Sequence, residues 1–167
     1  MRTNAISLAN YFVGLALTNS VDLFQLGLMK RVYITHGFCL AIHDKSALDP
    51  RYDVVEAWKY GPVIPSVYHS FKHNRNNPIA EKAVIINIEP SPYSVDIKTP
   101  ELTDEDADVK NIADMVWNRY LGISDSQMVE LTHRKGTPWG MCYRHGQTCE
   151  IPDLYTKAFY KKLIRTL

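Results

Sequence analysis

The chain has 167 residues, of which 46% are hydrophobic and 22% charged, as in an ordinary globular protein. Its length suits one domain, so we expect a single domain over residues 1–167 with a core that needs no disulfide bonds. The 19 basic and 18 acidic residues give a formal net charge of +1, which excludes a strong overall attraction to nucleic acid or to a membrane surface.

The cysteine content and the apolar stretches indicate the compartment. Cys39, Cys142 and Cys149 are too few, and odd in number, for a disulfide framework, which is typical of a reducing environment. Polar residues interrupt every long apolar stretch, so we expect neither a membrane span nor a signal peptide. These features predict a cytoplasmic protein.

Apolar residues at helical spacing predict two helices near the start of the chain. The first covers about residues 4–17, with Asn4 as its N-cap. The second runs from about Val21 to His43, and Lys30 and Arg31 fall beside its apolar stripe. That stripe consists of Leu23, Leu26, Met29, Val32, Tyr33, His36 and Leu40.

The segment EAWKYGPVIPSVYHSF, residues 56–71, places four aromatic residues around a Gly-Pro pair. We expect a helical turn from Val54 to Trp58 that ends at Gly61, because Pro62 restricts the backbone of the residue before it. Pro65 suits the first turn of a further helix.

Residues 83–98 are the one segment in which we expect strands. Apolar residues alternate on both sides of a short EPSP stretch, which predicts a β-hairpin. The alternating residues are Val84, Ile86 and Ile88 before the turn, and Tyr93, Val95 and Ile97 after it.

The rest of the chain again shows helical spacing. Thr103 is a natural N-cap for a helix that ends near Gly122, and a short helix follows over residues 124–134. A loop surrounds Pro138, and Pro152 opens a terminal helix. We expect that helix to turn Leu154, Tyr155, Ala158, Phe159, Leu163 and Ile164 inward. The predicted fold is mainly α, a compact single domain of five to six helices with one small β-hairpin.

No P-loop, GxGxxG or GxSxG motif is present in the sequence. His36 and Cys39 lie three residues apart, and such a histidine could activate the cysteine as a thiolate nucleophile. We expect Cys39 instead to pack as a small apolar residue. His133, Cys142, His145 and Cys149 form an H-x8-C-x2-H-x3-C set, whose spacing matches no common zinc finger. We expect no cofactor and no metal, and a small metal-dependent hydrolase using these four residues remains an alternative.

Aromatic residues are the strongest candidates for a binding role. Tryptophan and tyrosine are favoured at protein–protein contacts because they bury a large area and keep a polar group. Trp58, Tyr60, Tyr68 and Trp139 suit this role, and core packing is the alternative for each of them. The acidic residues of 101–108 offset the basic ones, so we do not expect a nucleic-acid partner.

Four segments in order resemble the Panacea-domain family, which includes SocA-like and GepA-like proteins of bacteria and their phages. They are LANYFVGLA, LGLMKRVYITHGFCLA, EAWKYGPVIPSVYHSFK and LTHRKGTPW, and the resemblance spans about residues 5–165. The Gly-Pro-Val and Thr-His…Pro-Trp boxes together are specific. Gly27 and Thr137 stand where the family usually has glutamine and serine.

The resemblance implies a binding protein and not an enzyme: an antitoxin of a type II toxin–antitoxin system that neutralises a cognate protein toxin by direct binding. A AAA+ protease would be a further partner if the chain is a proteolytic adaptor. A phage or prophage protein that blocks a host or defence factor is the alternative. We expect partner contacts from Lys30, Tyr33, His36, Lys59, Tyr60, Tyr68 and His133. We expect a structural role for Trp58, Gly61, Pro62, Pro138 and Trp139.

Overall fold

The structure is a computed structural model that describes residues 4–89 and 94–166. Its helices are α1 (Ala5–Thr18), α2 (Gln25–His43), α3 (Pro65–Phe71), α4 (Ala107–Tyr120), α5 (Asp125–Thr132), α6 (Pro138–Cys142) and α7 (Asp153–Ile164). Its strands are β1 (Glu56–Trp58), β2 (Gly61–Val63), β3 (Ile85–Glu89), β4 (Ser94–Lys98) and β5 (Cys149–Glu150). The predicted mainly α fold is confirmed.

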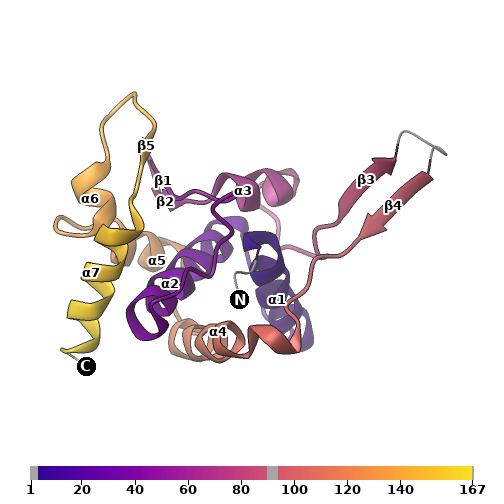
Figure 1. Cartoon of the computed structure of the whole chain (residues 1–167), viewed down its shortest axis with the longest axis horizontal. Helices are drawn as coiled ribbons and strands as arrows, with labels where there is room; N and C mark the ends of the chain where they lie inside the picture. The colour runs from indigo at the N-terminus through magenta and orange to yellow at the C-terminus, as the bar shows by residue number, and fades with distance from the viewer. Residues whose placement is uncertain (1–3, 90–93, 167) are drawn as a thin grey trace.

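Helix α2 is the centre of the fold, and α1, α4, α5 and α7 pack around it (Figure 1). Every residue from 27 to 40 is buried, so α2 has no solvent face along this stretch. Lys30 and Arg31, which were predicted to lie beside the apolar stripe, are themselves buried. The predicted start at Val21 is wrong, since Ser20 has a left-handed φ of 52° and the helix begins at Gln25.

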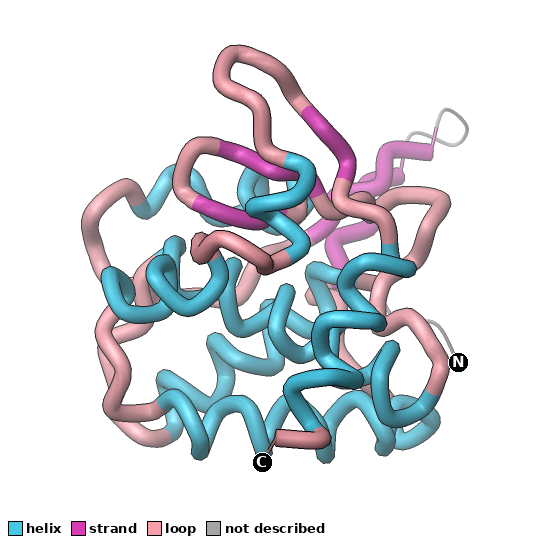
Figure 2. Tube along the Cα trace, turned by 90° about the vertical axis from the view of Figure 1, so that its left-hand side faces the viewer, coloured by secondary structure: helices cyan, strands magenta, loops and turns pink. Residues whose placement is uncertain are grey.

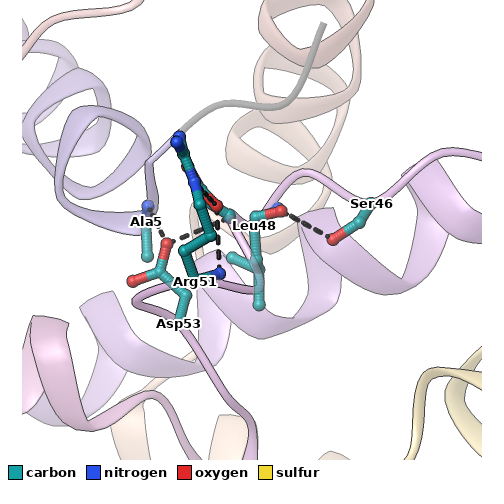
Figure 3. A network of polar contacts seen from close by, with 6 residues as sticks. Ala5, Ser46, Leu48, Arg51 and Asp53 are labelled. Carbon is teal, nitrogen blue, oxygen red and sulfur yellow. Dashed lines mark hydrogen bonds and ion pairs between the residues drawn. The ribbon is translucent and has the colours of Figure 1, made fainter.

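The start of α1 is tied to the loop that precedes β1. The Asn4 side chain accepts a hydrogen bond from the backbone N–H of Ile6 at 2.7 Å, which confirms the predicted N-cap. The buried carboxylate of Asp53 accepts hydrogen bonds from the Ala5 N–H at 3.0 Å and from the Ser66 hydroxyl at 2.7 Å. Figure 3 shows Asp53 beside Ala5, on the loop that also carries Arg51. One carboxylate thus fixes α1, this loop and α3 relative to one another.

A three-stranded antiparallel sheet with the order β2-β1-β5 lies at one end of the helical body, near the top in Figure 2. Ala57 pairs with Pro62 on one side of β1 and with Cys149 on the other. The helical turn predicted for residues 54–58 is therefore wrong. Val55 and Ala57 are buried while Val54 is exposed, and this period of two is that of a strand.

The β-hairpin predicted within residues 83–98 is confirmed as β3 and β4, but it is not the one place with strands. It projects away from the helices in Figure 1, and Ile86 pairs directly with Ile97. Four apolar side chains on it or next to it are between 51% and 62% exposed: Val84, Ile86, Val95 and Ile97. The predicted turn and Tyr93 lie outside the described residues.

Local capping signals also shape the second half of the chain. The Thr103 N–H and hydroxyl donate to the Asp106 carboxylate at 2.8 and 3.0 Å, at the start of the short 3-10 turn that leads into α4. The loop predicted around Pro138 is wrong, because Pro138 begins the short helix α6. The Thr137 hydroxyl accepts a hydrogen bond from the Gly140 N–H and caps this helix.

The inward face predicted for α7 is wrong in part. Leu154 is 71% exposed, and the buried residues of α7 are Thr156 and Tyr160. The Tyr160 ring lies where a side chain at Gly37 of α2 would be, since a Cβ there would be 2.3 Å from the ring. None of the described helices has both the length and the apolar character needed to cross a membrane.

Candidate protein-binding surface

The hairpin formed by β1 and β2, Glu56–Val63, carries the most exposed aromatic residue of the Gly-Pro segment, and we call it the Gly-Pro hairpin. Its turn residues are Lys59 and Tyr60, which are both exposed, and the Tyr60 side chain is 60% accessible. The Lys59 ammonium lies 5.1 Å from the centroid of the Tyr60 ring, within the range of a cation–π contact. The tip thus presents an aromatic ring and a positive charge together.

A buried lysine of α2 is hydrogen-bonded to this hairpin. Lys30 on α2 donates a hydrogen bond from Nζ to the carbonyl oxygen of Pro62 at 2.9 Å. Gly61 has a φ of +101°, and a Cβ at this position would be 2.8 Å from Lys30 Nζ. Only glycine fits both the backbone angle and the close approach. Burial lowers the pKa of Lys30 to about 7.

The late Thr-His…Pro-Trp box holds the other strand of the same hairpin. Trp139 donates from Nε1 to the carbonyl oxygen of Trp58 at 2.7 Å. Nε2 of His133 lies 3.0 Å from the carbonyl oxygen of Lys59, and the imidazole stacks on Trp139 with 3.5 Å between ring centroids. The two sequence boxes, distant along the chain, therefore meet at one site. Pro138 is buried in the first turn of α6, directly before Trp139.

Trp58 and Tyr68 form the half-buried flank of the hairpin. Their rings meet edge to face with centroids 4.9 Å apart. The Trp58 indole N–H donates to the Glu56 carboxylate at 2.6 Å, and the Gln25 amide donates to the Tyr68 carbonyl oxygen at 2.9 Å. The edge-to-face contact and the Glu56 bond hold the Trp58 ring, and part of each ring stays accessible.

The structure does not bring all of the predicted contact residues to the surface. Lys30, Tyr33 and His36 are buried in α2, so their side chains form no exposed surface. The Tyr33 hydroxyl lies 3.5 Å from the Thr156 hydroxyl, and His36 Nε2 lies 2.9 Å from the Asp153 carboxylate. Tyr33 and His36 thus hold α7 against α2, whereas Lys59, Tyr60, Tyr68 and His133 gather at the hairpin.

The cysteine of the His36–Cys39 pair is enclosed in the core. Burial raises the pKa of the Cys39 thiol to about 12, so this group is protonated and enclosed at neutral pH. Over residues 4–89 and 94–166, no group of three or more His, Cys, Asp or Glu side chains is arranged to hold a metal ion.

Two open grooves flank the tip of the Gly-Pro hairpin. The groove on the Lys59 side is lined in part by Trp58, Lys59 and Tyr143. The other, which we call the Tyr60 groove, is lined by Tyr60, Tyr68, the start of α2 and Arg75. The sequence predicts no role in protein binding for Arg75, because no motif contains it and its neighbours in the groove come from other segments.

Comparisons with known proteins find a family match that includes these segments. The sequence model of the family described as "Antitoxin SocA-like, Panacea domain" matches residues 28–140, which include Lys30, the Gly-Pro hairpin and Trp139. Antitoxin SocA of Caulobacter vibrioides (strain NA1000 / CB15N) is 29% identical over 136 residues, covering 81% of this chain and 68% of that protein. No solved structure matches the chain.

Proposed function

The chain belongs to the Panacea-domain family of SocA-like antitoxins, and on this basis we propose that it neutralises a cognate protein toxin by binding it directly. Family membership supports an antitoxin, a regulatory binding protein rather than an enzyme. The toxin is the partner expected for such a protein, and the Gly-Pro hairpin is the surface that we assign to it.

The observation that carries this assignment is the rigid presentation of an exposed tyrosine. Tyr60 is 60% accessible, while Lys30, His133 and Trp139 fix the backbone on both sides of it. A side chain held in place before binding loses less conformational entropy when the partner arrives. Tyrosine is also among the residue types that contribute most to protein–protein affinity.

The first test is co-expression with the protein encoded by the neighbouring gene, scoring growth with and without this chain. We expect the neighbour to stop growth and this chain to restore it, with the two proteins co-purifying. A neighbour that leaves growth unaffected would instead favour a phage interaction protein that blocks a host or defence factor.

The second test uses two tyrosines of similar exposure. We expect Tyr60→Ala to weaken toxin capture by about tenfold or more, because hot-spot side chains contribute that much. Tyr52 is 69% exposed and lines neither groove, so Tyr52→Ala should bind as the unmodified chain does. The thermal midpoints of both variants should equal that of the unmodified chain. Equal capture by the two variants would refute the assignment of Tyr60 to the interface.

We also propose that the chain can act as a proteolytic adaptor, which requires a second surface for a AAA+ protease. The β3–β4 hairpin exposes Ile86 and Ile97 and projects away from the Gly-Pro hairpin in Figure 1, so both surfaces are open together. Replacing both isoleucines with threonine should preserve toxin capture and lengthen the half-life of the toxin in cells. An unchanged half-life would remove the β3–β4 hairpin from this role.

A further inference from the structure

The Tyr60 groove combines accessible apolar surface with a positive rim. Phe24 and Leu26 at the start of α2 and Tyr68 on α3 line it and are half-buried, so part of their apolar surface faces solvent. Met29 lies at the buried side, and Tyr60 stands at the hairpin tip. Such a cleft can enclose one apolar side chain of a partner.

Arg75 places an exposed positive charge in the lining of this groove. It follows the 3-10 turn Lys72–Asn74, lines the groove and is exposed. Its φ of +53° is uncommon for a residue other than glycine, and strained backbone of this kind concentrates at ligand and partner sites. Within the part of the chain that the structure describes, no ion pair involves Arg75, Lys72 or Lys59.

The acidic residue in the lining, Asp125, is already engaged with the body of the protein. Its carboxylate accepts the backbone N–H of Gly27 at 3.1 Å, and it interacts with the buried guanidinium of Arg31. Among the described residues that line the groove, Arg75 is therefore the charged side chain without an opposite charge paired to it. Lys59 lies at the neighbouring hairpin tip.

We propose that the Tyr60 groove receives an apolar side chain of the toxin that is flanked by a carboxylate, with Arg75 binding the carboxylate. A guanidinium can form two parallel hydrogen bonds with a carboxylate, which adds geometric specificity to the charge. The apolar side chain packs on Phe24, Leu26 and Tyr68, with Tyr60 closing one side. This inference rests on the proposed antitoxin function and specifies the chemistry of its partner.

Two peptides test the groove without the toxin: acetyl-Asp-Trp-Asp-amide and acetyl-Lys-Trp-Lys-amide, titrated into the full chain and followed by NMR. We expect the acidic peptide to shift the Met29 methyl signal and the Tyr60 and Tyr68 ring signals. Its affinity should fall as salt is added, because the ion pair is at the surface. The basic peptide should cause no shift at these residues. Equal shifts from both peptides, or none from either, would overturn the proposal.

A matched pair of charge reversals tests the same groove with the toxin. Arg75→Glu should weaken toxin capture by about tenfold or more, since a like charge would face the carboxylate. Arg119 is exposed on α4 and lines neither groove, so Arg119→Glu is the control and should bind normally. Equal capture by the two variants overturns the groove proposal and leaves the antitoxin function standing. If the unmodified chain captures no toxin, the antitoxin proposal fails, and the peptide titration alone decides the groove.

Discussion

The ammonium nitrogen of Lys30 lies 2.9 Å from the carbonyl oxygen of Pro62, so a buried lysine of the central helix supports the exposed Gly-Pro hairpin. The Lys30 side chain is fully buried, and no ion pair of the described residues involves it. A single carbonyl compensates only part of the cost of burying a charge. The protonation of one amine is therefore coupled to the stability of the candidate binding surface.

We expect the free energy of unfolding to rise with pH above about 7 because of Lys30. Burial lowers its folded pKa from 10.5 to about 7, so between these values the unfolded chain holds a proton that the folded chain has lost. Stability increases with pH wherever the unfolded state binds more protons, by at most about 1.4 kcal/mol per pH unit for one group. Below the folded pKa both states are protonated, and this contribution is absent. Urea unfolding at pH 7, 8 and 9 measures the trend.

The control for this prediction is Lys30→Met, which cannot titrate. Buried thiol and phenol groups act in the opposite direction at high pH, because the unfolded chain loses their protons first. Cys39 is one such group, since burial raises its pKa to about 12. The difference between the unmodified chain and Lys30→Met removes this background. A difference that stays constant from pH 7 to 9 would show that the Lys30 pKa is not lowered.

Replacing each of two glycines with alanine tests whether the backbone of the Gly-Pro hairpin requires glycine at position 61. Gly61 has a φ of +101° and lies against Lys30, whereas Gly122 has no heavy atom within 4 Å of an added Cβ. Gly61→Ala should lower the free energy of unfolding by about 1–3 kcal/mol, the cost of a backbone conformation that alanine avoids. Gly122→Ala should be neutral, or stabilising by up to about 1 kcal/mol. Urea midpoints measure both, and equal effects would contradict the role of Gly61.

The features that the sequence predicted correctly are those that neighbouring residues determine. Asn4 caps α1 through Ile6, two residues away, and Thr103 is paired with Asp106. The period of two in residues 84–97 likewise identifies β3 and β4, because alternation over several residues requires no distant partner. Periodicity and caps are local, so one sequence is enough to read them.

The Gly-Pro hairpin could not be predicted in this way because distant residues build it. β1 and β2 have three residues each, too few for a clear period. The contacts that hold them come from Lys30 and from Trp139, which lies 81 residues beyond Trp58. The same reason explains why Lys30 was expected at the surface, since its partner Pro62 lies on another element.

The exposed β3–β4 hairpin should contribute little to the stability of the helical body. Ile86 and Ile97 form a direct cross-strand pair and are 57% and 62% exposed. Replacing both with threonine should change the free energy of unfolding by no more than about 0.5 kcal/mol, as for other surface substitutions. The matched control is Ile34→Thr in α2, which is 2% exposed and should cost about 2 kcal/mol or more. A large loss from the double replacement would mean that this hairpin packs on the body.

The three cysteines should differ sharply in their reaction with N-ethylmaleimide at pH 8. Cys142 and Cys149 are half-buried, whereas Cys39 is 2% exposed and burial raises its pKa to about 12. Only about one Cys39 thiol in ten thousand would then be a thiolate, the form that reacts. Mass spectrometry of the labelled peptides should find Cys142 and Cys149 modified in the folded chain, and all three cysteines modified in urea. Equal labelling of Cys39 and Cys149 without urea would show that α2 opens more readily than its burial implies.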